Sequence, residues 1–121
     1  MLNTRYFTPE RELYNYDGFI IAYGTDNISG GKTIGRRWEQ STENPYGYPH
    51  TFKNPQWFLD HSDATQSTLI GLMASKEADK DEVLEAMKDY MQSTQQLHID
   101  NVFVEVEEED VRHHFSKRQA Q

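Results

Sequence analysis

The aromatic residues of this chain are concentrated in its first half, and this distribution restricts where a hydrophobic core can form. Twelve of the fifteen Phe, Trp and Tyr residues lie at or before Phe58. Few residues are Leu, Ile or Val, so aromatic side chains must supply much of the area that folding buries. We therefore expect the first half of the chain to contribute a large part of the core.

Two segments in this half have the pattern of β-strands joined by a hairpin. Residues 18–23 combine β-branched and aromatic side chains directly after a turn at Asp17-Gly18. Residues 24–31 are rich in turn formers, and residues 32–39 are expected to return as a second strand. The proline-containing segment 44–50 must be irregular, because each proline restricts itself and the residue before it.

Further elements are predicted beyond residue 50. A short edge strand, interrupted at Pro55, is expected within residues 51–59. The apolar run at 67–74 is interpreted as a buried strand, and the alternating segment 98–107 as a last strand.

The clearest element is a helix over about residues 80–95. Asp79 is placed to cap its N-terminus, and Glu82 follows at the spacing of a capping box. One face of this helix is expected to be apolar, with residues at i, i+1, i+4, i+7 and i+8: Val83, Leu84, Met87, Tyr90 and Met91. Asp81, Glu85, Lys88, Asp89 and Gln92 are predicted on the opposite side.

This order of elements predicts an α+β fold: an antiparallel or mixed sheet of about five strands with one main helix packed on it. The 121 residues have the size of one domain, so residues 1–121 are interpreted as a single domain. The chain has no cysteine, which excludes disulfides, thiolate metal sites and cysteine nucleophiles. No apolar stretch approaches the ~20 residues that span a bilayer, so a cytoplasmic location is expected.

Negative charge is concentrated in the second half of the chain. The net charge is −8, and residues 77–110 hold two lysines against twelve acids, a local balance of −10. Such a field repels nucleic acids and anionic membranes and attracts basic partners. Direct contact with nucleic acid through this surface is therefore not expected.

The acids of this segment recur at regular intervals. On the predicted helix, Asp81, Glu85 and Asp89 follow one another at i+4, about 6 Å apart. On the predicted last strand, Glu105 and Glu107 lie about 6.6 Å apart. Glu108, Glu109 and Asp110 continue the series. These intervals are of the same order as the phosphate repeat along one nucleic-acid strand.

In size, charge and layout, the chain resembles the small DNA-mimic proteins of bacteria and phages. The resemblance covers roughly residues 77–110 and rests on charge rather than on a motif. It implies a non-enzymatic, inhibitory protein–protein interaction with a basic, nucleic-acid-binding protein, and it transfers no residue assignments. The eight acids are predicted as the contact residues from their charge and spacing alone. The resemblance implies neither a cofactor nor a metal. The plain alternative is a solvated face that keeps a small protein soluble.

Residues 24–33 look superficially like a phosphate-binding loop, because glycines and Lys32-Thr33 follow a strand. The motif requires its first glycine at the position of Asp26, whose negative charge would meet the phosphate. The following residues also favour a strand, whereas the motif needs a helix N-terminus there. A hairpin loop is the preferred interpretation.

Two other functions remain open. A small enzyme or ligand-binding protein would use an aromatic-lined pocket near Trp38, Tyr46, His50 and Trp57. Tyr46, Tyr48 and His50 are the aromatic-loop residues most expected to be exposed. A subunit of a phage or other assembly would instead pair its strand edges with neighbours.

The histidines give no specific metal or catalytic pattern. Two groups are candidates: His113 with His114, and His61 with Asp60 and Asp63. Neither has the spacing of a known metal or catalytic motif, so surface histidines are the simpler interpretation.

Overall fold

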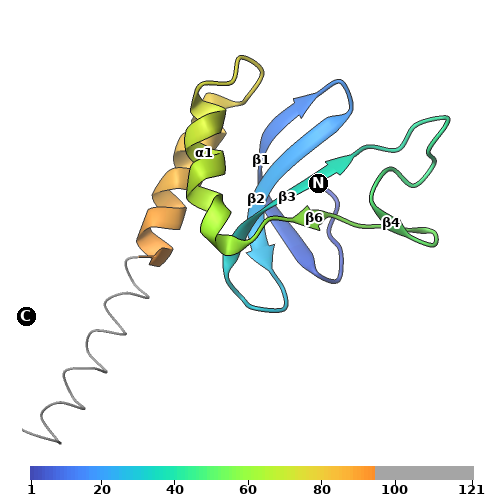
Figure 1. Cartoon of the computed structure of the whole chain (residues 1–121), viewed down its shortest axis with the longest axis horizontal. Helices are drawn as coiled ribbons and strands as arrows, with labels where there is room; N and C mark the ends of the chain where they lie inside the picture. The colour runs from blue at the N-terminus through green and yellow to red at the C-terminus, as the bar shows by residue number, and fades with distance from the viewer. Residues whose placement is uncertain (95–121) are drawn as a thin grey trace, which may run out of the picture. The chain divides into compact units, whose positions relative to one another are not determined.

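Three strands at the start of the chain form the larger part of an antiparallel sheet (Figure 1). In the computed structural model, which describes residues 1–94, these are β1 (Phe7–Tyr16), β2 (Phe19–Asp26) and β3 (Lys32–Trp38). Asp17 and Gly18 both have positive φ, 54° and 83°, as a two-residue Asp-Gly hairpin turn of type I′ requires. The strands and loop predicted for residues 18–39 are confirmed.

The first strand, β1, was not predicted from the sequence. It is an edge strand in the order β1-β2-β3-β6, and its register with β2 shifts between Pro9 and Arg11 and again between Glu12 and Tyr14. These shifts break the simple alternation by which a strand is recognised, because each one changes which side chains face the core. Only Phe7 and Leu13 of β1 are fully buried.

Residues 50–59 form three two-residue strands. β4 (His50–Thr51) pairs with β5 (Asn54–Pro55) in a small separate sheet, and β6 (Phe58–Leu59) pairs with β3 at the edge of the main sheet. β6 is the predicted edge strand, and Pro55 is the last residue of β5, the strand before it.

The segment 67–74 is a helix, and its interpretation as a buried strand is wrong. A short 3₁₀ turn, η1 (Ser62–Ala64), leads into α1 (Thr65–Met73). Thr65, Leu69 and Leu72 are buried at i, i+4 and i+7, the spacing of one helix face, while Ile70 is 52% exposed. A short apolar run does not distinguish these two structures by composition, and here packing against the sheet selects the helix.

A second helix covers residues 80–94, close to its predicted range. The Asp79 carboxylate accepts a hydrogen bond from the backbone NH of Glu82 at 3.2 Å, which confirms the predicted cap. Val83 is fully buried as expected, but Ala86 is buried with it, whereas Leu84 is 44% exposed. The packed face is thus turned slightly from the predicted one, toward Ala86.

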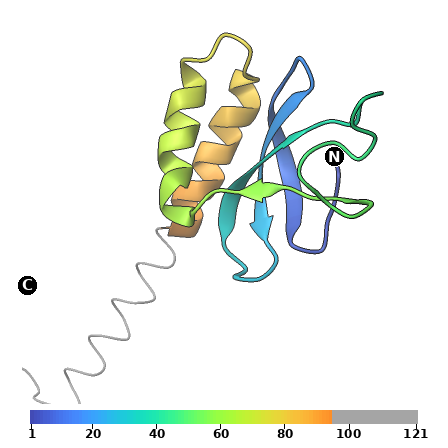
Figure 2. The ribbon, with the colours of Figure 1, turned by 45° about the vertical axis from the view of Figure 1, so that its right-hand side comes forward.

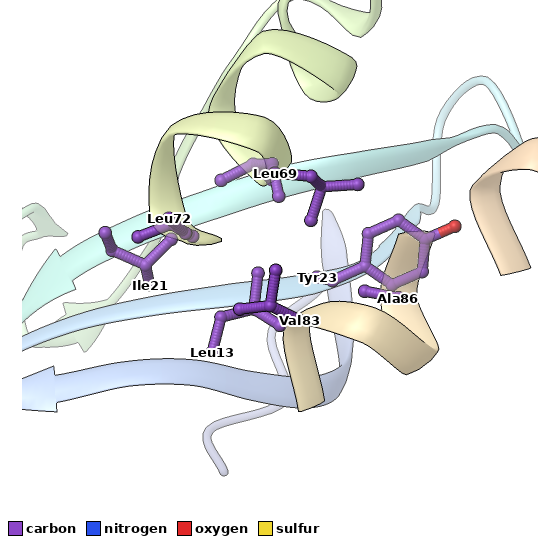
Figure 3. Packing of buried hydrophobic residues seen from close by; sticks show 8 residues of the cluster. Leu13, Ile21, Tyr23, Leu69, Leu72, Val83 and Ala86 are labelled. Carbon is purple, nitrogen blue, oxygen red and sulfur yellow. The ribbon is translucent and has the colours of Figure 1, made fainter. Parts of the chain in front are cut away.

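The two helices lie side by side against one face of the sheet (Figures 1 and 2). Their buried side chains meet those of the strands in one cluster (Figure 3): Leu13, Ile21, Tyr23, Ile34, Leu69, Leu72, Val83 and Ala86. On the other face, Phe7, Ile20, Ala22 and Trp57 form a second cluster. The Phe7 ring lies over Gly35 so closely that a Cβ there would be 2.7 Å from it.

The α+β class of the prediction is confirmed. Residues 1–94 contain a four-stranded antiparallel sheet, a two-stranded sheet and two α-helices, where about five strands and one main helix were expected for the whole chain. By its contacts the chain divides into Met1–Tyr90, whose fold is the one above, and Met91–Gln121. The predicted strand 98–107 lies outside the described residues, and the single-domain interpretation stays a prediction.

Candidate functional site

Three of the eight predicted contact acids lie on the 80–94 helix, within the described residues. They are Asp81, Glu85 and Asp89. The other five lie outside that part of the chain: Glu105, Glu107, Glu108, Glu109 and Asp110. The candidate site is therefore the acidic face of the 80–94 helix, together with the residues of the sheet that hold this helix in place.

The first turn of this helix is fixed to β1. The backbone NH of Asp79 donates to the carbonyl of Leu13 at 2.8 Å, and Ala78 forms an isolated bridge with Tyr14. One turn later, Arg11 of β1 donates to Glu82 at 2.9 Å. This bond and the nearby helix acids raise the pKa of Arg11. The contacts set which side of the helix faces the sheet.

Further along the helix, Asp89 is held by Tyr23, which belongs to the core cluster. The Tyr23 hydroxyl donates to Oδ2 of Asp89 at 2.7 Å. Burial, and then this hydrogen bond, raise the pKa of Tyr23 far above its ordinary value. Lys32 of β3 lies 3.7 Å from the same carboxylate and 2.6 Å from Glu10. Asp89, predicted on the side away from the apolar face, instead lies at the edge of that face.

The acids of the helix therefore fall into two groups. Glu82 and Asp89 contact the sheet through Arg11, Tyr23 and Lys32. Asp81 and Glu85 are exposed and make no ion pair with the sheet in the described structure; Glu85 contacts only Lys88 of its own helix, at 3.1 Å. Of the four acids on this helix in the described residues, these two at i and i+4 are the exposed ones.

The loop that superficially resembles a phosphate-binding motif is a tight hairpin loop between β2 and β3. The Asp26 carboxylate accepts hydrogen bonds from the backbone NH groups of Ile28, at 2.8 Å, and Ser29, at 3.3 Å. These amides are thus occupied by a carboxylate of the chain itself, and Lys32 points to Glu10 rather than into the loop. The loop is therefore a hairpin loop, as predicted, and these two amides are not free to bind a phosphate.

The residues proposed for an aromatic pocket do not form one group. Trp57 is buried on the Phe7 side of the sheet, with ring centroids 5.3 Å apart, and its indole NH donates to the carbonyl of Leu2 at 2.8 Å. Trp38 lies on the opposite face, against Phe19. The Tyr46 and His50 rings contact each other at 5.8 Å. Tyr48 and His50 are exposed as expected, and Tyr46 is half-buried.

A cavity of about 510 Å³ opens beside Trp57 and is lined by Glu12, Ile20, Arg37, Glu39, Pro55 and Trp57, among others. Arg37 is only 3% exposed, and it donates to two backbone carbonyls, those of Gln56 and Tyr46. Burial lowers the pKa of Arg37. Its guanidinium fastens the 44–57 segment to β3. No histidine is among the described residues that line this cavity.

Among residues 1–94, no cluster of acids and histidines has the arrangement of a metal site. His61 caps η1 by accepting a hydrogen bond from the backbone NH of Asp63 at 3.2 Å. His113 and His114 lie outside the described residues.

A row of four aromatic side chains on the helix-bearing face of the sheet was not predicted from the sequence. This aromatic row consists of Phe19, Trp38, Tyr48 and Phe58. The alternation of Ile34, Arg36 and Trp38 along β3 was a usable signal, since it places Trp38 on the core-facing side beyond the last core residue. The strand partners of Trp38 were not readable from the sequence.

Neither helix in the described part of the chain is long and apolar enough to cross a membrane. Comparison with protein-family models, curated proteins and solved structures finds nothing that matches this chain.

Proposed function

We propose that this protein is a non-enzymatic binding protein that engages a basic partner through the outward acids of its 80–94 helix. The observation that carries the proposal is the division of the helix acids. Glu82 and Asp89 fix the helix to the sheet, which leaves Asp81 and Glu85 directed to solvent from a rigid element. Like charges at i, i+4 cost a few tenths of a kcal/mol in helix stability, which an interaction with a cationic surface would offset.

The partner that best suits this surface is a nucleic-acid-binding protein, whose DNA the acids would displace. A helix carries carboxylates about 6 Å apart at i, i+4, an interval comparable to the phosphate repeat of a nucleic-acid strand. The attachment of the helix to the sheet reduces the entropy lost when such a surface is bound. Glu105, Glu107, Glu108, Glu109 and Asp110 would extend the acidic surface.

The test is a competition experiment with the full chain. Partners are captured at low salt, and each purified DNA-binding partner is mixed with a labelled DNA duplex. The protein should release the duplex, and Asp81→Asn/Glu85→Gln should require about tenfold more protein, since charged contacts contribute about 1 kcal/mol or more when partly desolvated.

A matched control removes the same charge elsewhere. Asp17→Asn/Asp63→Asn changes two exposed acids, and Asn-Gly keeps the I′ turn. This control should displace DNA as well as the wild type. Absence of any basic partner at low salt, or equal displacement by both double variants, contradicts the proposal.

A further inference from the structure

The cavity beside Trp57 lies on the face of the sheet that the two helices do not cover. Ile20 of β2 lies opposite Arg37 of β3, and both line the cavity. Glu12 of β1 lies opposite Ala22, whose side chain is on the same face as that of Ile20. Its volume of about 510 Å³ is within the range of small-molecule binding sites.

Arg37 brings a buried positive charge to this cavity. Its side chain is 3% exposed, and the ion pairs found within residues 1–94 do not include it. The carbonyls of Gln56 and Tyr46 accept one hydrogen bond from each of its two terminal nitrogens. Carbonyl groups satisfy these donors without neutralising the charge, and a buried charge without a counter-ion is unfavourable. Each terminal nitrogen keeps a second N–H, and a pair of such groups matches the two oxygens of a carboxylate.

Two acids at the same cavity restrict which anion can enter. Glu39 follows Arg37 by two residues, and its backbone NH donates to the Gly18 carbonyl at 2.8 Å, which continues the strand pairing. The two side chains therefore project from one face, about 6.6 Å apart. Glu39 and Glu12 both line the cavity. They would repel a phosphate, whereas a ligand with one carboxylate and one ammonium group complements all three side-chain charges.

The buried part of the remaining wall is apolar. Ile20 and Trp57 are each only 8% exposed, and Pro55 lies beside them in the lining. The indole NH of Trp57 already donates to the carbonyl of Leu2 at 2.8 Å, so the ring offers the cavity an apolar surface. An apolar side chain of the ligand would lose contact with water there.

We propose that this cavity binds a small zwitterion with an apolar side chain, of the size of an amino acid or a dipeptide. The ligand carboxylate accepts two hydrogen bonds from Arg37, its ammonium group lies near Glu39 and Glu12, and its side chain packs on Trp57. This site is separate from the acids of the 80–94 helix and goes beyond the proposed function.

The probes are L-leucine and L-leucyl-L-leucine, titrated into the full chain and followed by ¹⁵N–¹H NMR. The chain has two tryptophans, so two indole NH signals are expected, and Trp38→Phe assigns them. At least one probe should shift the Trp57 signal saturably by about 10 mM, the weak limit for a ligand of this size. The Trp38 signal, from the opposite face of the sheet, should not move.

Analogues of the better probe separate the charge contacts. Its amide, which lacks the carboxylate, should bind at least about tenfold more weakly, because Arg37 then has no counter-ion. Its N-acetyl derivative, which lacks the ammonium group, should bind a few-fold more weakly, because its carboxylate is no longer balanced beside the two acids. Inorganic phosphate should not shift the Trp57 signal.

A variant and a matched control test the acid at the cavity. Glu39→Gln should weaken the zwitterion a few-fold and should not weaken the N-acetyl derivative. Glu43→Gln changes another exposed acid, which is not among the lining residues, and should leave both affinities unchanged. Arg37→Lys should weaken both ligands about tenfold, since an ammonium lacks the planar fork of a guanidinium. If Arg37→Lys does not fold, the ligand series and Glu39→Gln carry the test.

Four results overturn the inference: no shift of the Trp57 signal with either probe, equal binding of the amide, equal effects of Glu39→Gln and Glu43→Gln, or a shift caused by phosphate. The helix variant Asp81→Asn/Glu85→Gln should bind the probes like the wild type. Failure at this cavity therefore leaves the proposed function standing, and failure of DNA displacement leaves the cavity site standing.

Discussion

The hydroxyl of Tyr23, in the middle of the sheet, donates a 2.7 Å hydrogen bond to Asp89 of the 80–94 helix, 66 residues later in the chain. This bond joins a fully buried ring of the core to the helix that carries the outward acids. It fixes the rotation of that helix, and with it the direction of Asp81 and Glu85.

Removing the Tyr23 hydroxyl should weaken this attachment. Tyr23→Phe should lower the free energy of unfolding by about 1 to 2 kcal/mol, since the bond has a charged acceptor. Tyr16→Phe is the control, because Tyr16 is 53% exposed. Urea unfolding followed by tryptophan fluorescence measures both, and equal midpoints for the two variants would contradict the role of the bond.

Tyr23 should also make stability fall in alkaline solution. Its folded pKa lies above the ordinary value of 10.0, because burial and the Asp89 hydrogen bond both disfavour the phenolate. The stabilisation is complete below pH 10.0 and is lost as the pH rises further, since only the unfolded chain then releases this proton. Above that pH, the wild type should lose about 1.4 kcal/mol per pH unit more than Tyr23→Phe. Urea midpoints at several alkaline pH values measure this, and parallel curves for the two proteins would exclude it.

The helical geometry of α1 predicts which of its apolar residues matter. Leu69→Ala and Leu72→Ala should each cost about 3 kcal/mol, because both side chains are buried against the sheet. Ile70→Ala should cost less than about 1 kcal/mol, because Ile70 is 52% exposed. In a strand buried on both faces, all three changes would be costly. Chemical denaturation of the three variants distinguishes the two structures.

Gly47 is needed beside Arg37. Its φ is 69°, and a Cβ there would overlap the Arg37 guanidinium and the carbonyl of Trp38. Gly30 has a similar φ of 80° with nothing within 4 Å of the Cβ position. Gly30→Ala should therefore cost about 1 kcal/mol through backbone strain alone. Gly47→Ala should cost about 2 kcal/mol more through overlap. Thermal unfolding compares them, and equal losses would show that the Arg37 contact is unimportant.

The sequence predicts some parts of this fold better than others, for physical reasons. The hairpin at Asp17-Gly18 and the cap at Asp79 are local, so neighbouring residues suffice to identify them. In α1, by contrast, an apolar run fits a strand or a helix equally well until its packing partners are known.

The candidate site shows the same limit. Exposure of Asp81 and Glu85 follows from helix periodicity, whereas the contact of Asp89 with Tyr23 depends on a pairing of distant segments. To predict the aromatic row, one must also know the register of β3 with its neighbouring strands, which could not be predicted from the sequence.

The salt dependence of partner binding tests the central claim most directly. The affinity of the full chain for its purified basic partner is measured over a range of salt concentrations, with wild type, Asp81→Asn/Glu85→Gln and Asp17→Asn/Asp63→Asn. Because ionic strength screens exposed charges, wild-type affinity should fall steeply with salt, and only the helix variant should show a weaker dependence. An affinity that is independent of salt, or a dependence that is the same in all three proteins, would contradict the assignment of the binding surface to Asp81 and Glu85.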